Sequence, residues 1–478
     1  MRRSYLTVAI VLLALALGLW LRLWFLWHFP QVNGDGLIYG DIAKNWLLHG
    51  IYGRTGYAAA GATIHPTLIR LPGYPLFLAA CFRIFGVDHY DAVLYLQVAI
   101  DLVSALVIAW TTRAVAGRRA GIWALYLAAL CPFTANYVAA PLSETLSIFC
   151  VAVACAALVW LQMRPGWAPC LLLAVDWSYA TLLRPDGAIL AVASFLAIVI
   201  FAHRSFAGWP PLGRARAWRL ALCAGLLSII PFAFWTARNL RTFHVFEPLA
   251  PRYATDPGES TVPGFQRWMK TWVVDFASTS DIYWNADTDP LEVDLLPSRA
   301  FDSQAQREQT ADIFAAYNES TTITPAIDAR FDALATERER AHPWRSYLEL
   351  PLLRVMDMWL RPRTEMLNIE LRWWQYDRHN AETEFAAGYA ALNLAYIILA
   401  VIGAWRMRKR QAMLVFAIVT YCMLRSLLLA TIEAPEARYT VEVFPMLCLL
   451  AGAAFASRRA ADESAATSGS RCSPCPSA

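Results

Sequence analysis

The chain has 478 residues, of which 58% are hydrophobic and 20 are tryptophan, and its mean hydropathy is +0.39. Because soluble domains average about 45–50% apolar residues, this composition excludes an ordinary soluble enzyme and predicts a polytopic membrane protein. The formal net charge of +4 indicates no particular partner. Most of the ten cysteines lie inside apolar runs, so a disulfide framework is not expected.

The first apolar run covers residues 5–27 and follows two arginines. A secretory signal peptide has a shorter apolar core and a small-residue cleavage site. This run instead ends in the aromatic belt of a membrane boundary, formed by Trp20, Trp24 and Trp27. We therefore expect an uncleaved first span with a cytoplasmic N-terminus, followed by a first outer loop over residues 28–89.

This outer loop carries the residues that are hardest to explain as structure alone. Asp35 lies shortly beyond the first span, Tyr39 follows one helical turn later, and Arg70 precedes a Pro-Gly-Tyr-Pro turn. Apolar residues recur between them at helical spacing, at Ile38, Ile42 and Trp46. A carboxylate and a guanidinium held near the headgroups suit chemistry on a lipid-linked phosphate. The alternative is that Asp35 only caps a helix.

Nine further spans are predicted beyond this loop, at about residues 90–109, 120–137, 144–163, 167–183, up to 203, 220–237, 385–405, 412–430 and up to 456. Residues 76–85 are too short to cross and should form a re-entrant or interfacial helix. The inner loops are rich in arginine and lysine, as the positive-inside rule requires. Charged residues inside the spans should face the interior or pair with one another; they are Asp101, Asp176, Arg425 and Glu442.

The predicted fold is an all-α polytopic membrane protein of about ten transmembrane helices. Its expected parts are an N-terminal membrane module (1–237), an outer segment (238–384), C-terminal membrane helices (385–457) and a disordered cytoplasmic tail (458–478). The outer segment shows amphipathic helix patterns at 298–317 and 325–340 and an interfacial pattern at 344–360. Both termini are placed in the cytoplasm.

The sequence offers little support for nucleotide or metal chemistry. It contains neither a GxxxxGK phosphate loop nor a GxGxxG motif. The DxD spacing at Asp287 and Asp289 is interpreted as a loop, and the CxxC spacing at Cys472 and Cys475 lacks the second pair of a zinc site. We expect no cofactor and no nucleic-acid partner, and the use of a divalent metal stays open.

Short motifs follow one another in a fixed order on the side assigned to the outside. They are G-D-G-x-x-Y-x-x-I-A-x-N at 34–45, G-x-Y-G at 50–53, R-x-P-G-Y-P at 70–75, P-L-S-E-T-L at 141–146, L-L-R-P-D-G at 182–187, W-T-A-R-N at 235–239 and E-A-R-Y at 436–439. This series resembles the GT-C glycosyltransferases, in particular the branch of protein mannosyltransferases and bacterial aminoarabinose transferases. The resemblance covers about two thirds of the chain.

The resemblance implies a hexosyl or pentosyl transferase of the bacterial inner membrane. Such an enzyme moves a sugar, with inversion, from a polyprenyl-phosphate donor to a lipid, glycan or protein acceptor on the outer face. Asp35 matches the family's base and Glu144 a second catalytic acid, although Glu144 could instead only favour a helix dipole. The implied phosphate ligands are Arg70, Arg184, Arg238 and Arg438. The implied substrate contacts are Tyr39, Tyr74 and Tyr439.

Two departures from the family pattern concern the acceptor. Gly36 stands where many relatives have a second acid, and Ile38 stands where the aminoarabinose branch has a basic residue. Two other functions stay open. A lipid or solute transporter would place its polar residues near the membrane midplane on broken helices, and a polysaccharide polymerase or ligase would use a similar lipid-linked donor.

Overall fold

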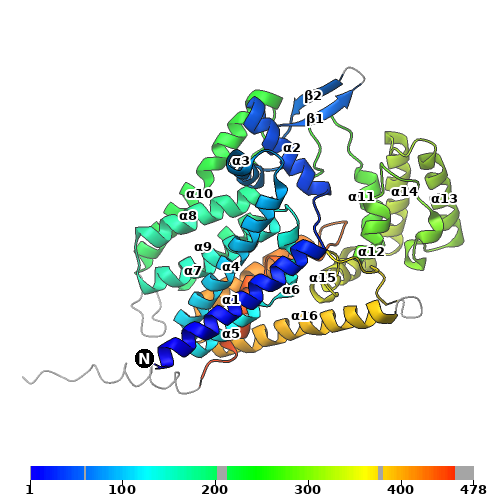
Figure 1. Ribbon diagram of the computed structural model, residues 1–478. Coiled ribbons are helices and arrows are strands. Elements are labelled where there is room, and N and C mark those ends of the chain that lie inside the picture. The colour runs from blue at the N-terminus through cyan, green and yellow to red at the C-terminus, as the bar shows by residue number, and fades with distance from the viewer. Residues whose placement is uncertain (1, 59–60, 202–212, 375–379, 458–478) are drawn as a thin grey trace, which may run out of the picture. The chain divides into compact units, whose positions relative to one another are not determined.

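The computed structural model describes residues 2–58, 61–201, 213–374 and 380–457 (Figure 1). The cysteines at 472 and 475 and the predicted tail lie outside these residues. The chain divides into two compact units: Met1–Asp256, Leu394–Cys422 and Val441–Ala478 form the first, and Pro257–Asn393 with Met423–Thr440 form the second. The side of the membrane that each loop faces and the domain boundaries expected from the sequence stay predictions.

The first unit contains most of the apolar helices. In chain order its elements are α1 Arg2–His28, α2 Gly34–His49, β1 Gly53–Ala58, β2 Gly61–Pro66, α3 Gly73–Phe85, α4 Tyr90–Ala116, α5 Arg118–Ala129, α6 Pro132–Ala135, η1 Asn136–Ala139, α7 Glu144–Met163, α8 Trp167–Leu183, η2 Pro185–Gly187, α9 Ala188–Phe201, α10 Arg214–Phe243 and α19 Phe444–Ala453. Helices α16 (Asn380–Met407) and α17 (Ala412–Leu429) contribute residues to both units.

Among the described residues, six helices are long and apolar enough to cross a membrane: α1, α4, α7, α10, α16 and α17. A seventh span results if α5 and the segment Pro132–Ala139, which are bent by 44° at their junction, count as one. These helices make the chain a multi-pass membrane protein. Three other predicted spans fall on the shorter apolar helices α8, α9 and α19, below the length of about 20 residues that a span usually needs. The count of ten therefore stays a prediction.

Small residues allow the apolar helices of the first unit to approach closely. Helix α4 packs against α5 and α7, α7 against α8, and α8 against α10, while α19 packs against α4 and α5. A Cβ atom added to Gly452 would lie 2.5 Å from the Cβ of Ala124, and one added to Gly403 would lie 1.7 Å from the carbonyl oxygen of Leu450. Glycine is required at both positions because the neighbouring backbone leaves no room for a side chain.

The bend after α5 is held by a buried arginine of α1 that the sequence analysis did not single out. The Arg22 guanidinium donates to the carbonyl oxygens of Ala129 at 2.6 Å and Ala128 at 3.4 Å, which belong to the last turn of α5. Its Nε donates to Asp101 of α4 at 2.8 Å. Both side chains are at most 2% exposed. The expectation that Asp101 is paired inside the bundle is thus confirmed.

The all-α expectation is wrong at one place, where β1 and β2 form an antiparallel hairpin within the first outer loop. Its register pairs Gly53 with Pro66 and Thr55 with Ile64. In Figure 1 the hairpin projects beyond the end of α2. The strands are rich in glycine and alanine, residues with weak strand preference, and β2 is mostly exposed, so no alternation of apolar and polar residues revealed them.

Acidic residues from two parts of the chain fix the base of this hairpin. Asp41 of α2 accepts from the backbone N–H and the hydroxyl of Thr55, both at 2.7 Å. Asp256, which follows α10, accepts from the Thr67 hydroxyl at 2.7 Å, the Leu68 N–H at 2.8 Å and Arg54 at 3.1 Å.

Arg238 of α10 completes the attachment of the hairpin base. Its guanidinium donates to the carbonyl oxygens of Thr67 at 2.8 Å and Tyr52 at 2.7 Å. Together with Asp256, it therefore holds both ends of the hairpin against the C-terminal end of α10.

The second unit is a small helical bundle with its own core. Its helices include α11 Pro263–Lys270, α12 Phe276–Ser278, α13 Gln304–Asn318, α14 Pro325–Ala341, α15 Leu350–Leu360 and part of α18 Arg438–Val441, with short η3 Thr279–Tyr283, η4 Val293–Leu295, η5 Ser298–Ala300 and η6 Arg345–Glu349 between them. Trp268, Trp272 and Phe331 are fully buried at its centre. The helices predicted at 298–317 and 325–340 are present, and α13 begins late because Ser303 caps it by accepting from the Gln306 N–H.

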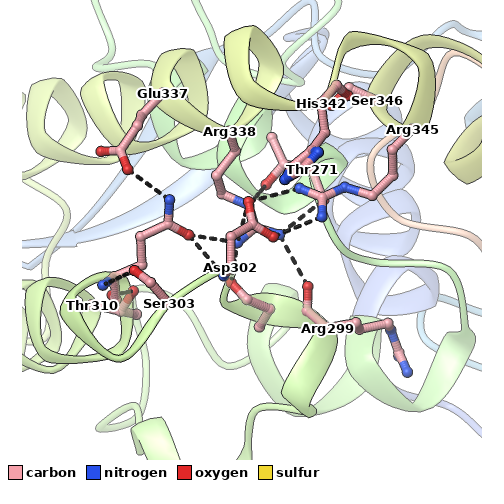
Figure 2. Close-up of polar contacts among 12 residues, drawn as sticks. Thr271, Arg299, Asp302, Ser303, Thr310, Glu337, Arg338, His342, Arg345 and Ser346 are labelled. Carbon is pink, nitrogen blue, oxygen red and sulfur yellow. Dashed lines mark hydrogen bonds and ion pairs between the residues drawn. The ribbon is translucent and has the colours of Figure 1, made fainter.

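A second buried arginine organises this unit. Arg338 of α14 is 0% exposed and donates to the Thr271 hydroxyl at 3.0 Å and to the carbonyl oxygens of Ala300 at 2.8 Å and Arg299 at 3.0 Å. Figure 2 shows its guanidinium among these oxygen atoms, beside Asp302, which also accepts two hydrogen bonds from Arg345. These arginines hold the pKa of Asp302 below its usual range, although burial opposes the shift.

We expect Arg22→Met to lower the free energy of unfolding by about 3–5 kcal/mol, because it leaves Asp101 buried without its partner and the last carbonyls of α5 without a donor. Thermal unfolding in detergent, followed by circular dichroism, measures this change. The control is Lys44→Met, which breaks an exposed pair with Asp88 and should cost at most about 1 kcal/mol. Equal melting temperatures for the two variants would contradict the role of Arg22.

We expect Asp256→Ala to loosen the hairpin base, because three hydrogen bonds to one carboxylate are lost and each is worth about 1.5–3 kcal/mol. Limited trypsin digestion should then cut the chain faster after Arg54, as seen by mass spectrometry of the fragments. Asp294→Ala is the matched control, since Asp294 is 80% exposed in its pair with Arg307. An unchanged rate of cleavage after Arg54 would show that Asp256 is not needed to hold the hairpin.

Candidate active site

The candidate active site begins with an ion pair across the first outer loop. Asp35 lies in the first turn of α2, and its Oδ1 accepts a hydrogen bond from Arg70 Nη2 at 2.7 Å. Both side chains are partly exposed, Arg70 by 22% and Asp35 by 27%. The loop therefore brings together a carboxylate and a guanidinium that are 35 residues apart in the sequence, and both side chains remain accessible to solvent.

Arg70 reaches Asp35 because the chain between them turns back twice. Helix α2 ends at Gly50, whose φ of 70° lies in the left-handed region that glycine tolerates. The hairpin then returns the chain, and the Tyr52 hydroxyl donates to the backbone carbonyl of Arg70 at 2.8 Å. Pro72 and α3 follow directly. The hairpin and its anchors thus determine where the Arg70 side chain points.

A second and more buried ion pair involves the motifs at 141–146 and 182–187. Glu144 is the first residue of α7 and is 2% exposed, and Arg184 follows the last residue of α8. Arg184 Nη1 lies 3.1 Å from Glu144 Oε1, while its Nε lies 3.2 Å from Asp186 and 3.2 Å from Glu442. The expectation that Glu442 is paired inside the protein is confirmed. The grouping of three carboxylates around Arg184 was not predicted from the sequence.

Tyr39 connects the two ion pairs. The Arg70 guanidinium lies 5.8 Å from the centre of the Tyr39 ring. Burial raises the pKa of the Tyr39 phenol; Arg70 and Arg184 lower it, and the carboxylates of Asp35 and Glu144 raise it. Because all four charged groups affect the pKa of one phenol, both ion pairs lie in the neighbourhood of Tyr39.

Tyr74 supports Tyr39 from below the loop surface. Its ring packs edge-on against Tyr39 with 5.1 Å between the ring centres, and it is 0% exposed. Its hydroxyl donates to Gln97 of α4 at 2.7 Å, and Gln97 in turn donates to the carbonyl oxygen of Ala140 at 2.8 Å. The structure therefore places Tyr74 beneath the site, and the predicted substrate contact of its hydroxyl stays a prediction.

Arg238 lies beside the site and holds backbone atoms. Besides the two carbonyl oxygens at the hairpin base, it donates to the Asn239 side chain at 3.0 Å. Its guanidinium is surrounded by the rings of Tyr52, Trp235 and Phe243 at 5.1–5.3 Å. These contacts give Arg238 a structural task, and its predicted contact with phosphate stays a prediction.

Arg438 and Tyr439 belong to the second unit. Arg438 pairs with Glu436 at 2.5 Å, and the Tyr439 hydroxyl donates to Glu436 at 2.9 Å. Arg425 donates to the carbonyl oxygen of Tyr439, and Arg363 to that of Ala437. Participation of Arg438 and Tyr439 in the same site as Asp35 stays a prediction. Arg363 was missed by the sequence analysis because its neighbourhood carries no recognisable motif.

Among the described residues, no group of three or more histidine, cysteine, aspartate or glutamate side chains is arranged to hold a metal ion. The site consists instead of guanidinium, carboxylate and phenol groups on the ends of helices. Such a set can orient a hydroxyl or amine, accept its proton and stabilise a developing negative charge.

No model of a protein family and no curated protein sequence matches this chain. Three solved structures resemble it. The oligosaccharyltransferase of Archaeoglobus fulgidus, tethered to an acceptor peptide with an NVT sequon, is 12% identical, with a TM-score of 0.51 over 94% of this chain and 49% of that one. The same archaeon's oligosaccharyltransferase AglB, in complex with an inhibitory peptide and a dolichol-phosphate, is 12% identical, with a TM-score of 0.52 over 100% and 53%.

The third structure is ArnT from Cupriavidus metallidurans bound to undecaprenyl phosphate, which is 14% identical, with a TM-score of 0.39 over 98% of this chain and 81% of that one. The chain spans about half the length of the archaeal oligosaccharyltransferase. At 12% identity the likeness concerns the fold alone, and the chain shares the fold of this archaeal oligosaccharyltransferase.

Proposed function

We propose that this protein is an inverting glycosyltransferase that moves a sugar from a polyprenyl-phosphate donor to an acceptor on the outer face of the membrane. The observation that carries the proposal is the gathering of Asp35, Arg70, Glu144 and Arg184 around Tyr39. A shared fold does not establish an activity, so the proposed activity rests on these site residues. The dolichol-phosphate in the AglB complex supports a lipid phosphate as the donor.

Asp35 is assigned the role of the base. It is partly exposed on the first turn of α2, where an acceptor hydroxyl or amine can donate to its carboxylate as the new bond forms. The acceptor atom bonds to the anomeric carbon, the bond from that carbon to the phosphate oxygen breaks, and the acceptor proton passes to Asp35. A single displacement needs one base, unlike the paired carboxylates of a retaining hydrolase.

Arg70 is assigned the leaving phosphate. The lipid phosphate gains negative charge as the bond breaks, and a fixed guanidinium stabilises that charge. Arg184 already meets three carboxylates among the described residues, whereas Arg70 lies at the more exposed ion pair with Asp35. We therefore assign Arg70 to the phosphate and give Arg184 the task of positioning Glu144.

An apolar cavity near Arg184 suits the tail of the donor lipid. It has a volume of about 480 Å³ and is lined by α8, α9 and α10 and by Leu249. Its lining is mainly apolar and includes Trp177, Phe195 and Leu226. Thr181 and Ala188, which flank Arg184 in sequence, also line it. A polyprenyl chain in this cavity, named here the α8–α10 cavity, would bring its phosphate toward the site.

We expect Asp35→Asn to reduce sugar transfer by about 10²–10⁴-fold, because the amide cannot accept the acceptor proton. The measurement is transfer of labelled sugar by purified protein, from a panel of polyprenyl-phosphate sugars to membrane extracts. Asp88→Asn is the matched control, since Asp88 is 47% exposed in its pair with Lys44. Near-normal turnover of Asp35→Asn would refute Asp35 as the base. Absence of both transfer and donor binding in the unmodified protein would favour a transporter.

We expect Arg70→Gln to raise the KM for the donor by about 10- to 100-fold, as the loss of a charge-assisted hydrogen bond of about 1.5–3 kcal/mol requires. Arg70→Lys should recover part of the affinity, since it keeps the charge without the two-pronged guanidinium. Arg184→Gln should instead lower kcat more than it raises that KM. Steady-state kinetics over a range of donor concentrations separates these effects. If Arg184→Gln mainly raised the KM for the donor and Arg70→Gln mainly lowered kcat, the roles assigned to Arg70 and Arg184 would have to be exchanged.

A further inference from the structure

A second cavity lies on the other side of α10, and the proposed reaction leaves it unused. Its volume is about 500 Å³. It is lined by the C-terminal end of α2, the segments on either side of the hairpin, and the outer end of α10. Representative lining residues are Trp46, Tyr52, Pro72, Trp235 and Arg238. We name it the hairpin cavity.

The two cavities lie on opposite faces of α10. The α8–α10 cavity is lined by Leu222, Gly225, Leu226, Ile229 and Phe232, and the hairpin cavity by Pro231, Phe234, Trp235, Arg238 and Thr242. At about 100° of rotation per residue, and with Ser228 counted in the first set, the mean directions of the two sets differ by about 145°. The two cavities are therefore lined by different faces of α10.

The lining of the hairpin cavity suits an amphiphile with one anionic group. Most of its walls are aromatic or aliphatic, and Arg238 supplies a positive charge. Arg238 uses three of its five N–H groups on Thr67, Tyr52 and Asn239, which leaves two with no hydrogen bond in the described part of the chain. A free sugar or a polar peptide would find few hydrogen-bonding partners on such walls.

The cavity adjoins an apolar surface on one side and the segment that carries Arg70 on the other. Phe234 on its lining is 74% exposed and Ile51 is 37% exposed, as is typical of lipid-facing side chains in a membrane protein. At the other end, Pro66 and Pro72 flank the segment that carries Arg70. Tyr52 lines the cavity, and its hydroxyl donates to the carbonyl oxygen of Arg70 at 2.8 Å.

We propose that the hairpin cavity binds the acceptor, and that this acceptor is a membrane lipid with an anionic head group. That this lipid is the acceptor rests on the proposed transfer reaction, whereas its chemical class is inferred from the lining of the cavity. The two lipids would then approach Asp35 from opposite sides of α10, with the donor tail in the α8–α10 cavity.

The test measures lipid binding without requiring turnover. The full-length protein in detergent is titrated with phosphatidic acid carrying brominated acyl chains, which quench nearby tryptophan fluorescence, and with brominated diacylglycerol, which lacks the phosphate. We expect saturable quenching, with a dissociation constant at least about tenfold lower for phosphatidic acid than for diacylglycerol. Trp235→Phe should reduce the amplitude of the quenching. Equal binding of the two lipids would overturn the proposal, because the cavity would then select only for apolar chains.

Two space-filling variants assign each lipid to its cavity while leaving Arg238 and the hairpin base unchanged. Thr242→Phe narrows the hairpin cavity and should weaken phosphatidic acid binding, with undecaprenyl phosphate binding unchanged. Ala191→Phe narrows the α8–α10 cavity and should do the reverse. If Thr242→Phe weakens only undecaprenyl phosphate, or neither lipid, the proposal is wrong.

The outcome can be separated from that of the proposed reaction. Binding of phosphatidic acid in the hairpin cavity without any sugar transfer would support the proposed class of ligand and refute the proposed reaction. A protein that transfers sugar normally in the Thr242→Phe variant, with an unchanged KM for the acceptor, would keep the reaction and refute this acceptor site.

Discussion

Wherever the backbone leaves a helix inside an apolar environment, its carbonyl oxygens need hydrogen-bond donors, and this protein supplies them with arginine. An unsatisfied carbonyl in such surroundings costs several kcal/mol, while a guanidinium offers five donors and keeps its charge. Arg22 holds the end of α5, Arg238 the base of the hairpin, and Arg338 the turns around Ala300. The irregular segments of both units depend on this one interaction.

The same chemistry explains why the site is rigid on one side and accessible on the other. Arg184 and Glu144 are largely buried and fixed by further carboxylates, whereas Arg70 and Asp35 remain about a quarter exposed. Tyr39 packs edge-on against the buried Tyr74 and lies beside the Arg70 guanidinium. A buried frame therefore holds the loop, while the Asp35–Arg70 pair stays partly exposed.

Hydropathy and charge predicted the long membrane helices well, since a run such as 5–27 admits few other structures. The pairing of Asp35 with Arg70 was foreseen only in outline: the two residues were recognised by their chemistry, but their contact depends on a hairpin in which seven of the twelve strand residues are glycine, alanine or threonine. Arg22 was hidden because one arginine among leucines looks like a membrane anchor. The α5 carbonyl oxygens that accept its hydrogen bonds lie more than a hundred residues away, where no sequence pattern can indicate them.

The attachment of the hairpin to Asp256 also sets an order of events during synthesis. Thr67 leaves the ribosome 189 residues before its partner. At about 5–20 residues per second, the first outer loop waits roughly 10–40 s before its last anchor is made. During that time α2 can hold the hairpin through Asp41 and Asn45, which contact Thr55 and Gly53. The first outer loop is thus made early in synthesis, and its contacts to Arg238 and Asp256 form only after α10 has been made.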